Sequence, residues 1–199
     1  MPGGGFARRV VAASLLAGGL AGDPAEPVHA QDIAARLQAC GACHGENGNS
    51  VLARVPSLAG QPKVFVETQL VMIREGLREI PEMKGLLEGV GDAEVTALAR
   101  HFAAQAPKTD PGPKDASLFE KGRALAEGAH CGSCHLPDFR GREQMPRLAG
   151  QREDYLLHAM ELFHTGRATG RDTIMAASLY GMSSDDLKAI AHFLAHSPP

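Results

Sequence analysis

The sequence contains few large aromatic side chains. It has no tryptophan, and aromatic residues make up only 5% of its 199 residues. A chain of this length can fold as one domain or as two small ones. Two small domains with so few large side chains would have little with which to fill their hydrophobic cores. We therefore expect something other than protein side chains to occupy part of each core.

The sequence also lacks an excess of positive charge. It has 20 Lys and Arg against 23 Asp and Glu, its formal net charge is −3, and it contains no long basic run. Nucleic-acid-binding proteins carry clustered basic residues, because they must neutralise phosphates. The composition therefore predicts no nucleic-acid partner.

The alternating hydrophobic pattern of strands and hairpins is absent as well. Apolar residues instead recur with helical spacing near the end of each half of the chain. They are Val95, Leu98, Ala99 and Phe102 in the first half and Leu187, Ile190, Ala191 and Leu194 in the second. Capping patterns precede both runs, with Gly91 and Glu94 before the first and Ser183 and Asp186 before the second. Two further helices are indicated over 65–76 and 155–166, so the fold class is all-α.

The first thirty residues have the features of an export signal. MPGGGFARR is a positively charged start, VVAASLLAGGLAG is an apolar run, and VHA at 28–30 resembles a cleavage site with small residues. We predict a signal peptide over 1–30 that is cleaved near Ala30, which places the mature chain in the periplasm. The alternative is an uncleaved membrane tether, which the short and Gly-rich apolar run disfavours.

No cysteine lies outside two CxxCH pentapeptides, CGACH at 40–44 and CGSCH at 131–135. Four cysteines in an exported protein would otherwise suggest two disulfides. On a helix, Cys at i and i+3 and His at i+4 project from one face. The two thiols can add to the two vinyl groups of a haem, and the adjacent imidazole can then reach the iron. This is the attachment pattern of c-type haem, and it predicts two haem c groups. They are held by Cys40 and Cys43 with His44, and by Cys131 and Cys134 with His135.

Two other interpretations of the cysteines are weaker. A CxxC redox pair would accompany a βαβ pattern, which this chain lacks. A structural zinc site would need a fourth ligand from elsewhere and would suit a reducing compartment better.

The second half of the sequence repeats the first with a period near 90. The two CxxCH motifs are 91 residues apart, PSLAGQ at 56–61 and PRLAGQ at 146–151 are 90 apart, and ALARHF at 97–102 lies 92 before AIAHFL. Such a period with small changes of offset indicates a duplicated domain. We predict a first domain over 31–104, a linker with three prolines over 105–115, and a second domain over 116–199.

The second axial ligand of each iron is less strongly indicated than the first. Met83 and Met175 correspond under the repeat, 39 residues after His44 and 40 after His135. A Met ligand opposite His is usual in electron-transfer cytochromes and raises the reduction potential. The other methionines of the mature chain are Met72, Met145, Met160 and Met182, and all six methionines can also be packing residues. Histidine ligation stays open too, although no histidine pair has the offset of 92 that relates Met83 and Met175. The candidates are His101, His130, His158, His164, His192 and His196.

Taken together, these motifs resemble the dihaem class I cytochromes c of the cytochrome c4 type. The resemblance covers essentially the whole mature chain, and its most specific segments are PEM at 81–83 and DTIM at 172–175. It implies two tandem helical domains, each wrapping one haem, with Met83 and Met175 as axial ligands. It also implies that the carbonyls of Pro56 and Pro146 orient the proximal imidazoles, as outer-shell groups do at metal sites.

The resemblance implies further roles for single residues and for the whole chain. Arg78 and Arg167 match positions near the haem propionates, and a solvated helix end is their alternative role. The chain would be a periplasmic one-electron carrier rather than an enzyme. Its partners would be redox proteins, namely a membrane oxidase or reductase, a cytochrome bc1-type donor or a dehydrogenase, and peripheral membrane association stays open.

Three other functions remain as alternatives at this point. The chain could be the electron-transfer subunit of a dehydrogenase complex, such as a flavin-dependent sulfide dehydrogenase. It could be a dihaem peroxidase, which would need one open iron and normally a larger chain. It could also be a gas-binding or sensory c-type protein, which binding of carbon monoxide would reveal.

The two halves differ in ways that the resemblance does not explain. The second half has a full helix before its motif, SLFEKGRALAEGAH, with Phe119 and Gly122 placed to meet the terminal helix near Phe193. The first half has only QDIAARLQA before Cys40, so its helix contact should be abbreviated. The second loop also carries four arginines that suggest either a docking patch for an acidic partner or a solvated basic loop. They are Arg140, Arg142, Arg147 and Arg152.

Overall fold

The computed structural model describes residues 1, 3, 30–170 and 172–199, and within these ranges the fold is helical. The export signal expected over 1–30 falls almost entirely outside the described residues. The only extended pairing among the described residues is an isolated bridge between Arg142 and Met145. No helix among them is long and apolar enough to cross a membrane. The expectation of an all-α fold is confirmed.

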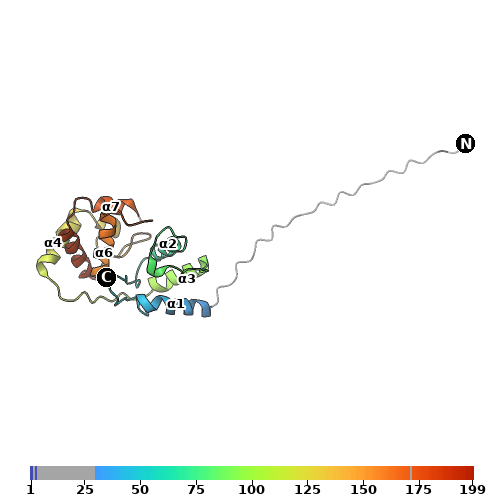
Figure 1. Ribbon diagram of the computed structural model, residues 1–199, viewed down its shortest axis with the longest axis horizontal. Coiled ribbons are helices and arrows are strands. Elements are labelled where there is room, and N and C mark those ends of the chain that lie inside the picture. The colour runs from blue at the N-terminus through green and yellow to red at the C-terminus, as the bar shows by residue number, and fades with distance from the viewer. Residues whose placement is uncertain (2, 4–29, 171) are drawn as a thin grey trace.

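The helices form two groups, one from each half of the chain (Figure 1). The first group contains α1 (Ala30–His44), α2 (Lys63–Arg74), the short 3-10 helix η1 (Pro81–Met83) and α3 (Asp92–Ala103). The second contains α4 (Ala116–Gly128), α5 (Gly132–His135), α6 (Glu153–His164), α7 (Thr173–Ser178) and α8 (Ser184–Ala195). No helix lies over residues 105–115, the segment predicted to be a linker. Each CxxCH motif ends a helix, α1 or α5, so the two motifs occupy corresponding places.

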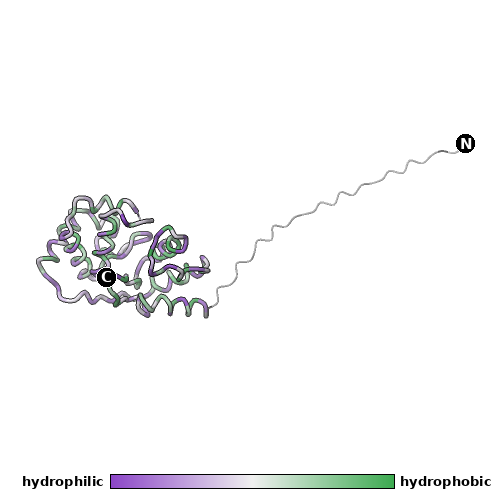
Figure 2. The backbone as a smooth tube through the Cα atoms, viewed as in Figure 1, coloured by the Kyte–Doolittle hydropathy of each residue, from purple (hydrophilic) through white to green (hydrophobic). Residues whose placement is uncertain are grey.

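Each half has a hydrophobic core of its own. In the first, residues of α2 and α3 form a buried cluster with Leu87 and Val90. In the second, α6 and α8 supply most of a larger cluster, which also includes Ala126 of α4 and Phe139. Hydrophobic and hydrophilic stretches alternate along the helices of both groups (Figure 2). This is the pattern of helices that bury one face and expose the other.

The capping signals seen in the sequence are present in the structure. Ser183 begins α8 as its N-cap residue, accepting from Asp186 N–H at 3.2 Å, and Asp186 accepts from Ser183 N–H at 3.0 Å. At α3, Glu94 accepts from Gly91 N–H at 3.0 Å, which is half of the same arrangement because glycine has no side chain. These bonds satisfy N–H groups that the first helical turn leaves without partners. The two terminal helices therefore begin where the sequence predicted.

The predicted difference between the two halves is also present. In the second half, α4 crosses α8, and the rings of Phe119 and Phe193 meet edge to face with centroids 5.1 Å apart. A break at His130, with φ of 54°, separates α4 from α5. In the first half, α1 continues unbroken into its CxxCH motif. The first domain therefore has no counterpart of the α4 to α5 break, and α1 has only ten residues before Cys40, whereas fifteen residues from the start of α4 precede Cys131.

The crossing of α4 and α8 depends on Gly122, which is buried against α8. A Cβ on this residue would collide with the carbonyl oxygen of Ala189 and lie 2.8 Å from the Cβ of Phe193. We therefore expect Gly122→Ala to lower the free energy of unfolding by about 3 kcal/mol, the upper end of the usual cost of overpacking. Denaturant unfolding followed by circular dichroism measures this.

Gly128 supplies the matched control, because it ends the same helix and a Cβ added to it would have no atom within 4 Å. Gly128→Ala should leave stability unchanged or raise it slightly, since alanine favours helix more than glycine does. Equal losses from the two substitutions would show that the close approach to α8 does not control stability.

Candidate functional site

Each CxxCH motif places its thiols and its imidazole on the last helical turn of its segment. Cys40, Cys43 and His44 lie at the end of α1. Cys131 is the N-cap residue of α5, and His135 is the last residue of that helix. All four cysteines are free thiols, and none is joined in a disulfide. The arrangement is that required for two thiols and one imidazole to approach a ligand from the same side.

The two histidines have the same orientation, fixed by the same kind of bond. His44 Nδ1 lies 2.8 Å from the carbonyl oxygen of Pro56, and His135 Nδ1 lies 2.9 Å from that of Pro146. Because a carbonyl can only accept, Nδ1 carries the proton in both rings and Nε2 keeps its lone pair. Burial lowers the pKa of both imidazoles, despite the opposing effect of the proline carbonyls, and this favours the neutral form that binds metals.

The Nε2 atom of His135 is buried and has no hydrogen-bond partner within the described structure. Burying a polar atom without a hydrogen-bond partner costs free energy, so such an atom in a native structure indicates that a ligand or ion binds there. An unpaired imidazole is not sufficient evidence by itself, because His101 Nε2 is also buried and unpaired. His135 differs in having two free cysteines beside it and a carbonyl that fixes its tautomer.

Met83 and Met175 border the cores of their respective halves. Met83, the last residue of η1, is half-buried and packs against the cluster of the first half. Met175 lies in α7, is half-buried and packs against the cluster of the second half, as Cys131 does. The two methionines therefore occupy corresponding places although their local helices differ. Met160, by contrast, is a buried member of the core.

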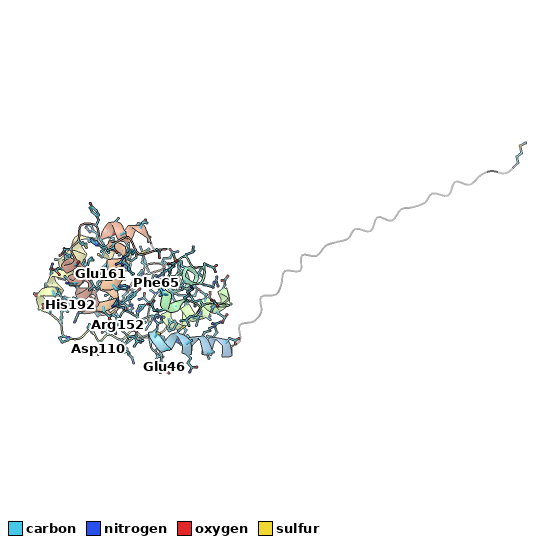
Figure 3. All side chains as sticks on the ribbon, in the orientation of Figure 1. Glu46, Phe65, Asp110, Arg152, Glu161 and His192 are labelled. Atoms are coloured by element: carbon cyan, nitrogen blue, oxygen red, sulfur yellow. The ribbon has the colours of Figure 1, made fainter. Side chains whose placement is uncertain are left out.

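His192, one of the alternative ligands and labelled in Figure 3, has no free ring nitrogen. Its Nε2 accepts from Asp115 N–H at 3.0 Å, and its Nδ1–H donates to Glu153 at 3.0 Å. Glu153, His192 and His196 together offer ligand atoms close enough for a metal ion. A metal at Nδ1 would move the proton to Nε2, which already faces a backbone N–H. These bonds therefore fix the start of α4 to α6 and α8, and they leave no lone pair on His192 for a metal.

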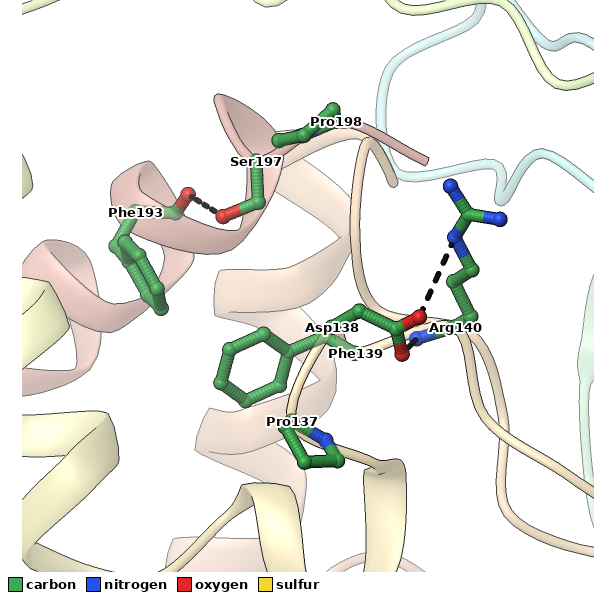
Figure 4. A pocket seen from close by; sticks show the side chains of 7 residues that line it. All are labelled: Pro137, Asp138, Phe139, Arg140, Phe193, Ser197 and Pro198. Atoms are coloured by element: carbon green, nitrogen blue, oxygen red, sulfur yellow. Dashed lines mark hydrogen bonds and ion pairs between the residues drawn. The ribbon is translucent and has the colours of Figure 1, made fainter.

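The hollow drawn in Figure 4 is a separate feature. Its volume is about 200 Å³, and Pro137, Phe139 and Phe193 form part of its wall. Ser197 donates to the carbonyl of Phe193 at 2.8 Å, and Arg140 pairs with Asp138 across 3.5 Å. Its polar side chains thus already have partners within its own wall, and none of the predicted haem-site residues lines it.

The two halves are joined by a reciprocal pair of glutamine side chains, which the sequence motifs did not identify as functional. The Gln151 amide accepts from Ser57 N–H and donates to Ser57 C=O, both at 2.8 Å. The Gln61 amide accepts from Arg147 N–H and donates to Arg147 C=O, both at 3.0 Å. Gln61 corresponds to Gln151, and Ser57 to Arg147, at the repeat offset of 90. The glutamine that ends both PSLAGQ and PRLAGQ was the feature of the sequence that could have pointed to these junction residues.

Further contacts cross the same junction. Arg152, labelled in Figure 3, donates to the carbonyl of Ser50 at 3.2 Å and pairs with Asp154 at 3.0 Å. Asp154 also accepts from Arg54 N–H at 3.0 Å, and these bonds hold the pKa of its carboxyl below its usual range even though desolvation opposes them. A Cβ on Gly170 would collide with the backbone of Leu77, so the loops that follow α2 and α6 also touch.

These contacts correct the expectation of a basic docking patch. Arg147 is only 3% exposed, and Arg152 is half-buried and paired with an acid. Only Arg140 and Arg142 of the four arginines in this loop are exposed. The four arginines do not form one basic surface, because Arg147 and Arg152 make contacts at the domain junction.

Known proteins with the same organisation match the chain over most of its length. Residues 119–198 match the family model described as Cytochrome c. The chain is 33% identical over 171 residues to cytochrome c4 of Pseudomonas aeruginosa, covering 80% of this chain and 84% of that protein. The chain belongs to the cytochrome c4 family. It is also 30% identical over 207 residues to the thiosulfate dehydrogenase electron acceptor of Thiomonas intermedia, covering 96% and 92% of the two chains.

The structure agrees with that of a cytochrome c4. The reduced recombinant cytochrome c4 of Pseudomonas stutzeri superposes with a TM-score of 0.77 at 28% identity, covering 85% of this chain and 98% of the other. The prediction of two class I cytochrome c domains is therefore confirmed. As a cytochrome c4, the chain binds two haem c groups and is an electron carrier rather than an enzyme. The free thiols, the neutral imidazoles and the unpaired Nε2 of His135 fit these groups.

Proposed function

We propose that His44 and His135 bind the two haem irons through Nε2 and that Met83 and Met175 bind them from the opposite side. Cys40 and Cys43 would hold the first haem by thioether bonds, and Cys131 and Cys134 the second. This assignment is supported by the Nδ1 bonds to Pro56 and Pro146 and by the corresponding places of the two methionines. The haem-bearing units would be 31–104 and 116–199, joined by 105–115.

The same proposal gives Arg78 and Arg167 a place near the haem propionates. Arg78 is half-buried and donates to Gln69 at 2.6 Å, while Arg167 is exposed and donates to Thr165 at 3.1 Å. Both follow a middle helix, α2 or α6, so they lie at corresponding ends of the two halves. Arg167 is the weaker candidate, because an exposed guanidinium loses much of its electrostatic effect to water.

When bound, haem supplies reversible one-electron chemistry at its iron. The protein's part is to hold the metal in an environment that changes little between the two oxidation states. Two protein ligands on each iron would leave no coordination position for a substrate. The buried bonds of Gln61 and Gln151 would keep the two halves in a fixed relation, so that an electron can be exchanged between them.

We place this carrier in the periplasm, between a membrane donor of the cytochrome bc1 type and a terminal oxidase or reductase. Support comes from the leader-like first thirty residues and from the likeness to cytochromes c4. To test this, the oxidised holoprotein is mixed with source membranes and quinol, and haem reduction is followed by absorbance. Reduction that stops with a bc1-type inhibitor, followed by oxygen-dependent reoxidation, is the expected result. Reduction that is insensitive to such an inhibitor would contradict the assigned donor.

A second role is favoured by one specific observation. The likeness to the thiosulfate dehydrogenase electron acceptor of Thiomonas intermedia extends over 96% of this chain. The chain would then accept electrons from a periplasmic dehydrogenase instead of a membrane complex. Thiosulfate-dependent reduction by a periplasmic extract without membranes would favour this role, and sulfide-dependent reduction by a co-purifying flavoprotein would favour a sulfide dehydrogenase.

A further inference from the structure

Two peptide units at the domain junction are hydrogen-bonded at both ends. In the unit Pro56–Ser57, the carbonyl accepts from His44 at 2.8 Å and the N–H donates to Gln151 at 2.8 Å. In the unit Pro146–Arg147, the carbonyl accepts from His135 at 2.9 Å and the N–H donates to Gln61 at 3.0 Å. Each histidine is therefore linked, through one peptide group, to a glutamine of the other half.

These bonds act on one another because the amide group is conjugated. Its C–N bond has partial double-bond character, so a hydrogen bond at the N–H shifts electron density toward the carbonyl oxygen. The carbonyl then becomes a stronger acceptor, and hydrogen bonds in such chains reinforce each other by about 10–30%. A stronger acceptor at Nδ1–H makes the imidazole a better electron donor at Nε2, which is how outer-shell groups tune a metal.

We propose that Gln61 and Gln151 are crossed positioning residues that set the reduction potential of the haem in the opposite half. Gln151 acts on the first haem through His44, and Gln61 acts on the second through His135. The inference rests on the proposed binding of iron by these two histidines. A more strongly donating imidazole stabilises the oxidised iron, so each glutamine lowers the potential of the haem across the junction.

The glutamines also hold the two halves together, and that structural role predicts a different result. Loosening the junction would admit water to both haem sites at once. Water favours the more highly charged oxidised site, so both potentials would fall. Loss of the hydrogen-bond chain instead raises one potential, that of the haem across the junction.

The test is a potentiometric titration of holoprotein variants, with the two haems distinguished by their separate signals in the Met83→Ala and Met175→Ala proteins. For Gln151→Leu we expect the equilibrium constant for reduction of the first haem to rise roughly two- to fivefold, as suits a bond one step removed from the ligand. The second haem should change little, because Gln61 still bonds Arg147 and holds the two halves together. Gln61→Leu should give the mirror image. Gln38→Leu, at an exposed position of α1, is the control and should change neither.

Outcomes other than a crossed rise overturn the proposal. These are unchanged potentials, an equal shift of both haems, and a fall at either haem. A failure of the underlying ligand assignment is distinguishable, because it appears in the unmutated protein. That protein would then lack the near-infrared absorption of a Met-bound iron or would bind carbon monoxide when reduced.

Arg147 supports a second and independent inference. Its side chain is buried at the junction, where the guanidinium donates to the carbonyl of Ala59 at 2.9 Å and to that of Ala149. Nε has no partner, and no acidic side chain is paired with this residue among the described residues. Burial lowers its pKa to about 10, so the group remains charged at neutral pH. An uncompensated buried cation costs several kcal/mol, which an anion would offset.

We infer that Arg147 is a carboxylate-binding residue whose ligand is a haem propionate at the domain junction. A paired Arg and carboxylate would satisfy Nε–H and neutralise both charges, as in other buried pairs. The cation would also favour the reduced state of the nearer haem, because reduction adds one negative charge. The corresponding residue of the first half is Ser57, so the cation is present once.

Replacement of Arg147 should therefore lower a potential, the opposite direction from the glutamine variants. In Arg147→Gln we expect the reduction equilibrium constant of at least one haem to fall about tenfold, which corresponds to about 59 mV for one electron. Arg147→Lys keeps the charge, so it should retain at least half of the difference in reduction potential between the unmutated protein and Arg147→Gln. It also provides the test if Arg147→Gln does not take up two haems. Arg140→Gln removes an exposed charge from the same loop and is the control. Potentials in Arg147→Gln equal to those in the control would refute the assignment.

Discussion

Met83→Ala and Met175→Ala should each remove half of the near-infrared absorption that arises from methionine bound to ferric haem. Each substitution removes one thioether, and the alanine cannot replace it as a ligand. The potential of the affected haem should fall on the order of 0.1–0.2 V, a part of the range of about 0.8 V that axial ligands span. The reduced variants should also bind one carbon monoxide per chain, because one coordination position has opened.

Matched controls come from methionines in similar surroundings. Met182 is half-buried and packs against the same core as Met175, and Met72 is half-buried in α2. Met182→Ala and Met72→Ala should keep the full near-infrared band and bind no carbon monoxide. A band that keeps its full intensity in Met83→Ala or Met175→Ala would show that the replaced methionine is not an iron ligand.

Simultaneous replacement of Gln61 and Gln151 by leucine should uncouple the two halves. Either substitution alone leaves one buried N–H and one buried C=O without partners, at Arg147 or at Ser57. Each such group costs about 1–3 kcal/mol, so each variant should weaken the docked state by about 2–6 kcal/mol. Separation of the halves re-exposes the groups to water, and the segment 105–115 keeps the halves in one chain.

Thermal unfolding followed at the haem absorbance measures this uncoupling. We expect one cooperative transition in the unmutated protein and two separate transitions in the double variant, since domains that share no interface unfold independently. Gln38→Leu alters an exposed glutamine and should leave the transition unchanged. A single transition with an unchanged midpoint in the double variant would show that these hydrogen bonds do not hold the halves together.

The longer helices of this protein could be predicted because they carry local signals, whereas the short helices η1 and α7 were not predicted. Ser183 and Asp186 mark the start of α8, and the spacing of Leu187, Ile190 and Leu194 marks its buried face. The crossing of α4 and α8 was predictable from Gly122, because only a residue without a Cβ permits so close an approach. Such signals involve residues that are close together in the sequence, so they can be recognised without knowledge of the fold.

The site was predictable only in part, for a different physical reason. The CxxCH motifs are local, whereas the roles of Gln61 and Gln151 depend on contacts across 86 and 94 residues of sequence. Their repetition was visible, but its purpose needs the geometry of the junction. Arg147 was placed with exposed arginines because arginine is seldom fully buried without a partner. Its burial arises from docking between the halves, which no pattern within one loop reports.

A closed dihaem electron carrier is tested most directly by a coulometric titration of the purified holoprotein, with carbon monoxide present as the reduction proceeds. We expect uptake of two electrons per chain in one-electron steps, one for each haem, and no carbon monoxide adduct, because every iron has two protein ligands. Uptake of one electron per chain, or an adduct at either haem, would contradict this function.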